Sequence, residues 1–186
     1  MHPEHLALLQ QAPASTHADD TWARLCCEQA LLAVEEGCYA VGALLVDGAG
    51  ELLCNGRNQV FAPAYASAAH AEMQVLDQLE SEHAQVDRRD LTLYVSLEPC
   101  LMCYGRILLA GITRVRYLAR DRAGGFALRH GRLPPAWANL ASGLAVVQAK
   151  ADPYWLDLAE QLIERLQDRR AMRERVVAAW RGSQVS

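Results

Sequence analysis

The sequence predicts an α/β fold in which a central sheet carries helices on both faces. Two observations support this prediction: helical and strand-like patterns alternate along the chain, and a hairpin pattern precedes that alternation. A length of 186 residues suits one domain with a substantial core. We therefore expect a single domain over residues 1–186, with its main part over about 19–150 and C-terminal helices over about 153–181.

The opening helix is expected to run from Asp19 or Asp20 to about Glu36. Aspartate is a favourable N-cap, because its carboxylate accepts unpaired N–H groups of the first turn. Apolar residues recur on one face of this segment, and Gly37 supplies a stop signal.

The remaining elements follow from the same patterns. Runs of β-forming residues predict strands, and apolar residues at helical spacing predict helices. In chain order we expect strands over 41–46 and 51–54, a helix over 68–80, a strand over 91–97, a helix that ends near residue 110, strands over 113–118 and 144–149, and two final helices. Glycine and proline residues between Gly124 and Gly143 predict a long irregular stretch instead.

Two short motifs carry the candidate chemistry: His70-Ala71-Glu72 and Pro99-Cys100-Leu101-Met102-Cys103. Zn²⁺ favours imidazole and thiolate ligands, and a catalytic zinc takes three protein ligands and leaves the fourth position to water. Cys100 and Cys103 are three residues apart, which places them on one face of a helix. We therefore expect His70, Cys100 and Cys103 to bind zinc.

Glu72 is the expected catalytic residue. Zinc lowers the pKa of its bound water, and a neighbouring carboxylate is then needed to move protons between that water and the substrate. A redox or structural reading of the two cysteines alone leaves His70 and Glu72 unexplained. The combined pattern matches the H-x-E…P-C-x-x-C signature of zinc-dependent nucleobase deaminases.

On these residues the chain resembles the cytidine deaminase-like superfamily from about Val41 to about Asp121. The resemblance implies a three-layer α/β/α sandwich with a mixed five-stranded sheet, and it usually brings a homodimer or a larger assembly. It also implies that the backbone around Ala43 faces the substrate and that Asn58 reads the base. His70 and the Leu97-Glu98-Pro99-Cys100 sequence favour the branch of guanine, cytosine and tRNA adenosine deaminases.

The first candidate function is hydrolytic deamination of a free nucleobase, nucleoside or related amino-heterocycle, with guanine and purine metabolism leading and cytosine behind. Phe126 is then expected to stack on the ring, and His130 is a candidate in the long loop. Guanine deaminases of this type tend to place an acidic residue after such a Gly-Phe pair, whereas this chain has Ala127.

The second candidate function is deamination of the wobble adenosine in tRNA. The segments Thr92–Cys100 and Ala119-Arg120-Asp121 are similar to that family. Asp121 is a candidate substrate-binding residue, although it could be structural in either case. The net charge of −4 and the single lysine argue against a nucleic-acid substrate. A non-catalytic zinc-bearing subunit is a third candidate, but the retained Glu72 argues against it.

Charge is unevenly placed along the chain. Residues 165–186 contain six arginines against Asp168 and Glu174. This basic helix could contact phosphates, or its arginines could simply face solvent and balance an acidic body, and we favour the second interpretation.

Localisation is inferred from what the sequence lacks. The N-terminal residues show no signal-like pattern, and no segment approaches the roughly 18 apolar residues of a membrane span. The cysteines outside the metal motif show no spacing typical of disulfide scaffolds. We expect a soluble cytoplasmic enzyme without a membrane partner.

Overall fold

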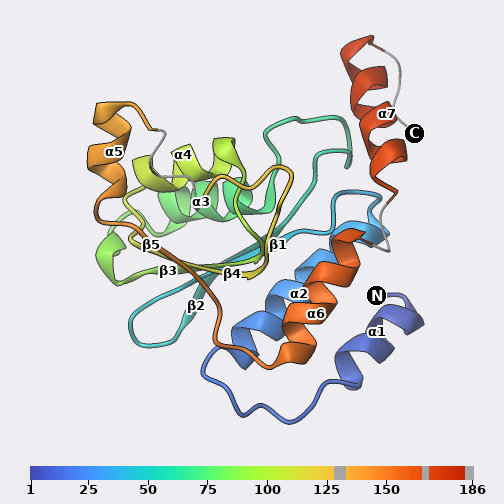
Figure 1. Ribbon diagram of the computed structural model, residues 1–186, viewed down its shortest axis with the longest axis horizontal. Coiled ribbons are helices and arrows are strands. Elements are labelled where there is room, and N and C mark those ends of the chain that lie inside the picture. The colour runs from blue at the N-terminus through green and yellow to red at the C-terminus, as the bar shows by residue number, and fades with distance from the viewer. Residues whose placement is uncertain (128–132, 165–167, 183–186) are drawn as a thin grey trace.

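The protein forms a mixed five-stranded sheet with helices on both faces, as the sequence predicts (Figure 1). The computed structural model describes residues 1–127, 133–164 and 168–182. The strands are β1 (Gly42–Val46), β2 (Leu52–Arg57), β3 (Thr92–Leu97), β4 (Arg114–Ala119) and β5 (Ala145–Gln148).

The sheet has the strand order β2-β1-β3-β4-β5. β1 pairs antiparallel with β2, with which it forms the predicted hairpin. β1 also pairs antiparallel with β3 on its other side. β3 pairs parallel with β4, and β4 pairs parallel with β5. Parallel neighbours need crossover connections, and helices fill that role after β3 and after β4.

The helices form two layers on opposite faces of the sheet (Figure 1). They are α1 (Pro3–Gln10), α2 (Asp20–Glu35), α3 (Ala71–Glu82), α4 (Leu101–Leu109), α5 (Pro135–Ala141), α6 (Pro153–Glu164) and α7 (Arg169–Trp180). One core joins α3 and α4 to the sheet, and a second joins α2 and α6 to the opposite face. The final helix, α7, extends away from the α2 and α6 layer.

Two helices were not anticipated. α5 lies inside the stretch predicted to be irregular, so that prediction is wrong for residues 135–141. The helix is only seven residues long and begins at a proline, which is favourable at the first helical position but also reads as a loop signal in a sequence. α1 precedes the predicted elements and buries Leu9.

Asp19 occupies the N-cap position of α2, but its side chain makes no capping hydrogen bond. Its carboxylate instead accepts the Tyr94 hydroxyl at 2.8 Å and the backbone N–H of Lys150 at 2.6 Å, and the Arg116 guanidinium lies 3.2 Å away. Asp19 therefore joins the start of α2 to β3, β4 and the segment after β5.

Asp20 joins the same end of α2 to neighbouring backbone. Its carboxylate accepts the N–H groups of Thr16 at 2.8 Å, His17 at 2.7 Å and Asp152 at 2.6 Å. Burial alone raises the pKa of Asp20, but these three bonds outweigh it and lower the pKa below its ordinary value.

Among the helices that the described residues form, none combines the length and the apolar content that a membrane crossing requires. All six cysteines lie in the described part of the chain, and no disulfide bond joins any two of them.

Candidate active site

The two motifs meet at the N-terminal ends of neighbouring helices. His70 is the N-cap residue of α3, and Cys100 is the N-cap residue of α4. Cys103 lies in the first turn of α4 and is buried. The N-terminal end of a helix carries partial positive charge, so it stabilises a thiolate at Cys100.

The three predicted ligands form one cluster. His70 Nδ1 lies 3.8 Å from Cys100 Sγ and 3.5 Å from Cys103 Sγ. A tetrahedral ion with bonds of about 2.3 Å to sulfur and about 2.1 Å to nitrogen separates these atoms by about 3.6 Å. The donor types and their spacing therefore fit Zn²⁺.

The ionisable groups of this cluster perturb one another. The hydrogen bond between the two thiols lowers the pKa of Cys100 and raises the pKa of Cys103, so the pair shares one proton. Burial opposes the charged form of His70, but Cys100 and Glu72 raise its pKa above the ordinary value. Such a set releases protons when a cation binds to it.

Glu72 lies in the first turn of α3 and is 3 % exposed. Burial disfavours the carboxylate and raises the pKa of Glu72, with the positive charge of His70 acting in the opposite direction. A carboxyl group with a raised pKa exchanges protons more readily near neutral pH. A buried carboxyl group with these properties can exchange protons beside the ligand cluster.

The start of α3 packs directly on the sheet at Gly56 of β2. A Cβ atom at Gly56 would lie 2.9 Å from Gln74 Cβ and 3.1 Å from the Ala71 carbonyl oxygen. Only glycine allows this close approach without a shift of the helix. The position of Glu72 therefore depends on Gly56 in β2, the second strand of the hairpin.

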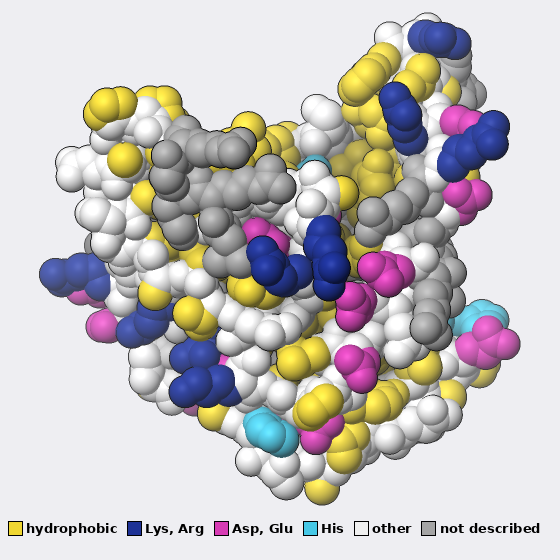
Figure 2. Space-filling model, in the orientation of Figure 1, with side chains coloured by type: hydrophobic (Ala, Val, Ile, Leu, Met, Phe, Trp, Pro, Cys, Tyr) yellow, Lys and Arg dark blue, Asp and Glu magenta, His cyan; other side chains and the backbone are white. Residues whose placement is uncertain are grey.

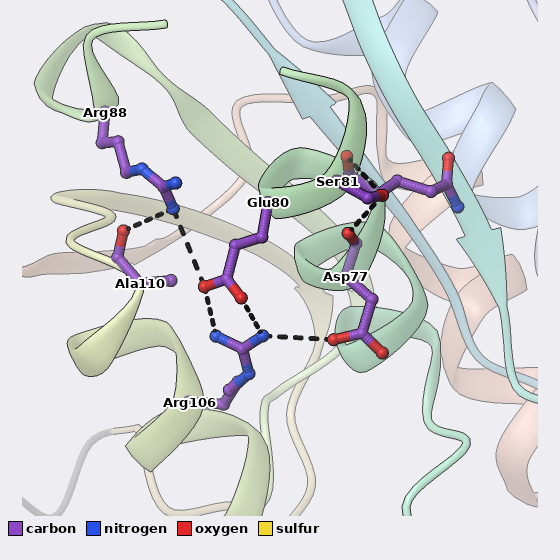
Figure 3. A network of polar contacts seen from close by, with 7 residues as sticks. Asp77, Glu80, Ser81, Arg88, Arg106 and Ala110 are labelled. Atoms are coloured by element: carbon purple, nitrogen blue, oxygen red, sulfur yellow. Dashed lines mark hydrogen bonds and ion pairs between the residues drawn. The ribbon is translucent and has the colours of Figure 1, made fainter. Parts of the chain in front are cut away.

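A network of ion pairs joins the outer faces of α3 and α4 (Figure 3). The Arg106 guanidinium of α4 donates to both carboxylate oxygens of Glu80, at 2.6 and 2.7 Å, and to Asp77 at 3.1 Å. Arg88 contributes a longer ion pair to Glu80 at 3.9 Å and donates to the Ala110 carbonyl at 3.2 Å. The two helices that carry the ligands are thereby held together away from the site.

A cavity of about 470 Å³ opens beside the ligand cluster. Its lining comes from three parts of the chain: the ligand motifs, the ends of β1, β2, β3 and β4, and the two C-terminal helices. The lining residues are Tyr39, Val41, Asn58, His70, Glu72, Leu97, Glu98, Cys100, Asp121, Ala123, Gly124, Ile163 and Met172.

Asn58 and Asp121 are the predicted substrate-binding residues that line this cavity. Asn58 is 1 % exposed, and its side-chain oxygen accepts the Val60 N–H at 3.1 Å, so the amide NH₂ group is the donor end of this side chain. Asp121 accepts the N–H groups of Ala123 at 3.0 Å and Gly124 at 2.9 Å. Asp121 therefore shapes the loop that forms one side of the cavity.

The other predicted substrate-binding residues lie elsewhere. Ala43 is buried in β1, opposite Gly56 and Val95, and is not a lining residue. Phe126 is also outside the lining, and its ring packs edge-on against Tyr104 with centroids 5.5 Å apart. His130 lies outside the described residues.

Sequence reasoning did not assign Tyr39, Glu98, Ile163 or Met172 to the site. Ile163 and Met172 recur on the apolar faces of the C-terminal helices, but periodicity does not distinguish a residue facing the core from one facing a cavity. Tyr39 precedes β1, and only the packing of α7 beside it shows that it lies on a cavity wall.

The family comparison supports this reading of the site. Residues 16–119 match the family described as the cytidine and deoxycytidylate deaminase zinc-binding region. The tRNA-specific adenosine deaminase of Bacillus subtilis is 35% identical over 107 residues, which are 58% of this chain and 65% of that protein. The match thus spans a little less than two thirds of this relative.

Solved structures show the same fold. A structure from a study of tRNA:A34 deaminases covers 62% of this chain and 89% of its own, with 29% identity and a TM-score of 0.56. A guanine deaminase from Nitrosomonas europaea covers 87% of this chain and 93% of its own, with 22% identity and a TM-score of 0.58. At that identity the second likeness shows the fold alone.

Proposed function

Because the chain belongs to the cytidine and deoxycytidylate deaminase zinc-binding family, we propose that it hydrolyses an exocyclic amine of a free nucleobase, nucleoside or related amino-heterocycle. The reaction consumes water, forms a ring carbonyl and releases ammonia. A guanine-type base in purine metabolism is the leading substrate class, and cytosine follows.

The residues divide the work in a simple way. His70, Cys100 and Cys103 would hold Zn²⁺, and the ion would supply Lewis acidity that lowers the pKa of water so that hydroxide is available near neutral pH. Glu72 takes a proton from water, delivers one to a ring nitrogen and helps to protonate the departing amine. Asn58, which also lines the cavity, donates a hydrogen bond to the ring.

The observation that carries this proposal is the cavity wall contributed by the C-terminal helices. Ile163 and Met172 line the cavity together with Tyr39, so an apolar surface faces the ligand cluster. A volume of about 470 Å³ suits a small planar heterocycle. Ile163 and Met172 lie outside the 16–119 segment that matches the family.

The test is ammonia release by the zinc-loaded protein against guanine, cytosine, adenine, their nucleosides, related aminotriazines and a tRNA anticodon stem-loop with a wobble adenosine. We expect turnover of at least one free base or nucleoside, and a kcat lowered by about 10²–10⁴-fold in a Glu72→Gln variant with the same zinc content. Turnover confined to a tRNA anticodon stem-loop with a wobble adenosine would reject the proposal.

Wobble-adenosine deamination in tRNA is the alternative function. Its support is the 35% identity to the Bacillus subtilis tRNA-specific adenosine deaminase. Arg170 and Arg181 on the outer face of α7 add a basic surface that could contact phosphates. If the alternative holds, charge reversal at Arg170 and Arg181 should weaken stem-loop binding and reduce its salt dependence.

We further propose that the whole chain forms a single deaminase domain and acts as a homodimer in the cytoplasm. Leu101 and Leu109 on α4 are 61% and 65% exposed, and apolar residues at such exposure favour contact with a second copy. Sedimentation equilibrium tests this directly, since Leu109→Glu should shift a dimer towards monomer.

A further inference from the structure

One arginine of the C-terminal basic helix faces the body of the protein. The Arg175 guanidinium carbon lies 4.1 Å from the centroid of the Phe61 ring. Its Nη1 atom donates to the Gly37 carbonyl and lies 3.9 Å from Met172 Sδ. Its Nε atom is buried and finds no hydrogen-bond partner among the described residues. Arg175 is therefore a partly desolvated anchor and not a solvent-facing charge.

The same face of α7 carries the residue that reaches the cavity. Met172 precedes Arg175 by one helical turn, is 9% exposed and lines the cavity. It also packs in a small cluster with Val60 and Phe61, next to Tyr39. A shift of Arg175 on Phe61 would therefore move Met172 relative to the cavity.

Phe61 also contacts two other aromatic residues, Tyr39 and Tyr65. The centroid of the Phe61 ring lies 5.7 Å from that of Tyr39, which lines the cavity, and 5.9 Å from that of Tyr65. At the far end of α7, Trp180 Nε1 donates to the Tyr65 hydroxyl at 3.1 Å. The segment around Phe61 is thus a surface on which α7 packs, and Arg175 is the charged residue of α7 that contacts it.

The opposite face of α7 has a different character. Arg170, Arg173 and Arg181 line a shallow outer surface with Val177, and Arg170 pairs with Glu174 at 2.9 Å. Figure 2 shows hydrophobic side chains on one side of this projecting helix, and basic and acidic side chains on the other. Arg173 is exposed and close in sequence to Arg175, so it offers a matched control.

We infer that Arg175 is a positioning residue that seats α7 on Phe61 and thereby sets Met172 as a specificity-determining wall of the substrate cavity. This inference rests on the proposed function and deepens it. Met172 offers a polarisable apolar surface, which suits the face of a planar heterocycle. A bulkier substrate needs Met172 to withdraw, so the wall favours a free base over the corresponding nucleoside.

The kinetic experiment compares Arg175→Ala, Arg175→Lys and Arg173→Ala in the zinc-loaded full chain, with the free base found to be the best substrate. We expect Arg175→Ala to raise KM by about tenfold, consistent with loss of a desolvated cation–π contact and a hydrogen bond, with kcat within about twofold. Arg175→Lys keeps the charge but not the planar fork, so it should rescue part of the loss. Arg173→Ala should leave both constants within about twofold.

A second variant tests the wall itself. Met172→Ala should raise turnover of the nucleoside relative to the free base by about tenfold, because the shorter side chain adds space at this wall of the cavity. An unchanged ratio in Met172→Ala, or an unchanged KM in Arg175→Ala, would overturn the inference.

Hydrogen exchange separates this inference from the proposed function, because it needs no substrate. Arg175→Ala should speed amide exchange across α7 and residues 59–65, and Arg173→Ala should not. Absence of turnover by the unmodified enzyme, with faster exchange in Arg175→Ala, would reject the proposed substrates but keep the role of Arg175 in packing α7 against Phe61. Unchanged exchange in Arg175→Ala would reject the positioning role of Arg175, whichever substrate the enzyme hydrolyses.

Discussion

The two sides of the cavity differ in how they are built. On one side, His70, Glu72, Cys100 and Cys103 come from short motifs at the starts of two helices. On the other side, Ile163 and Met172 come from helices outside the segment that matches the family. The first side contains the chemistry, and the second is an apolar surface. The contrast teaches that reaction type and substrate choice can be encoded in separate parts of one chain.

The largest expected effect lies on the chemical side. Glu72→Gln should lower kcat by about 10²–10⁴-fold, because it removes the group that moves protons. Zinc content and thermal stability should stay close to those of the unmodified protein. Glu82→Gln, at the exposed end of the same helix, is the control and should keep full activity. Near-normal turnover by Glu72→Gln would contradict the assigned mechanism.

Loss of a ligand should affect both metal and stability. Cys100→Ser and Cys103→Ser should each bind much less zinc and unfold at a lower temperature, because the ion ties the start of α3 to the start of α4. Metal analysis and thermal unfolding with and without added zinc measure the two effects. Cys54→Ala removes a buried thiol outside the cluster and should retain zinc. Normal zinc content in either ligand variant would refute the ligand set.

Far from the cavity, Asp19 should affect stability without affecting zinc. Asp19→Ala removes the acceptor of Tyr94 and Lys150 and leaves Arg116 without its carboxylate. We expect the free energy of unfolding to fall by about 2–4 kcal/mol, since buried partners lose their hydrogen bonds. Denaturant titration checks this, and Asp19→Asn, which retains one oxygen acceptor, should lose less. If Asp19→Ala lost as much zinc as Cys100→Ser, the proposed independence of this stability effect from zinc binding would be wrong.

Acid should weaken the same end of α2 through Asp20. Its pKa lies below the ordinary value in the folded chain, so the unfolded chain binds more protons at acid pH. The stabilisation is present at neutral pH and is lost as the pH falls below about 4 and through the folded-state pKa. Urea titrations between pH 7 and pH 3 should show a steeper loss for the unmodified protein than for Asp20→Asn. Equal slopes would remove Asp20 as a source of acid sensitivity.

The smallest expected effect is at the ion pairs between α3 and α4. Arg106→Ala should lower the free energy of unfolding by about 1 kcal/mol or less, because such partly exposed pairs are screened by solvent. The loss should shrink as salt is raised from about 0.05 M to about 1 M. A salt-independent loss would mean that packing of the arginine stem dominates.

The sequence alone determined the α/β class, the zinc ligands as a set and the succession of the main strands along the chain. Those features depend on short-range patterns: alternation of apolar residues, spacing of three residues within a helix, and turn residues between strands. α5 was missed because a short helix that begins at proline looks like a loop. Asp19 was expected to cap α2, but its carboxylate serves Tyr94 and Lys150 from distant strands and loops.

Only the tertiary structure decided what surrounds the ligand cluster. The cavity wall joins Tyr39, Ile163 and Met172, which are far apart in sequence, and no local pattern encodes their meeting. The arginine-rich helix could be read from composition as basic, but composition does not show that Arg175 turns inwards onto Phe61. Metal ligands are recognisable in sequence because their chemistry restricts residue type and spacing, whereas an apolar wall accepts many residues and is defined by packing.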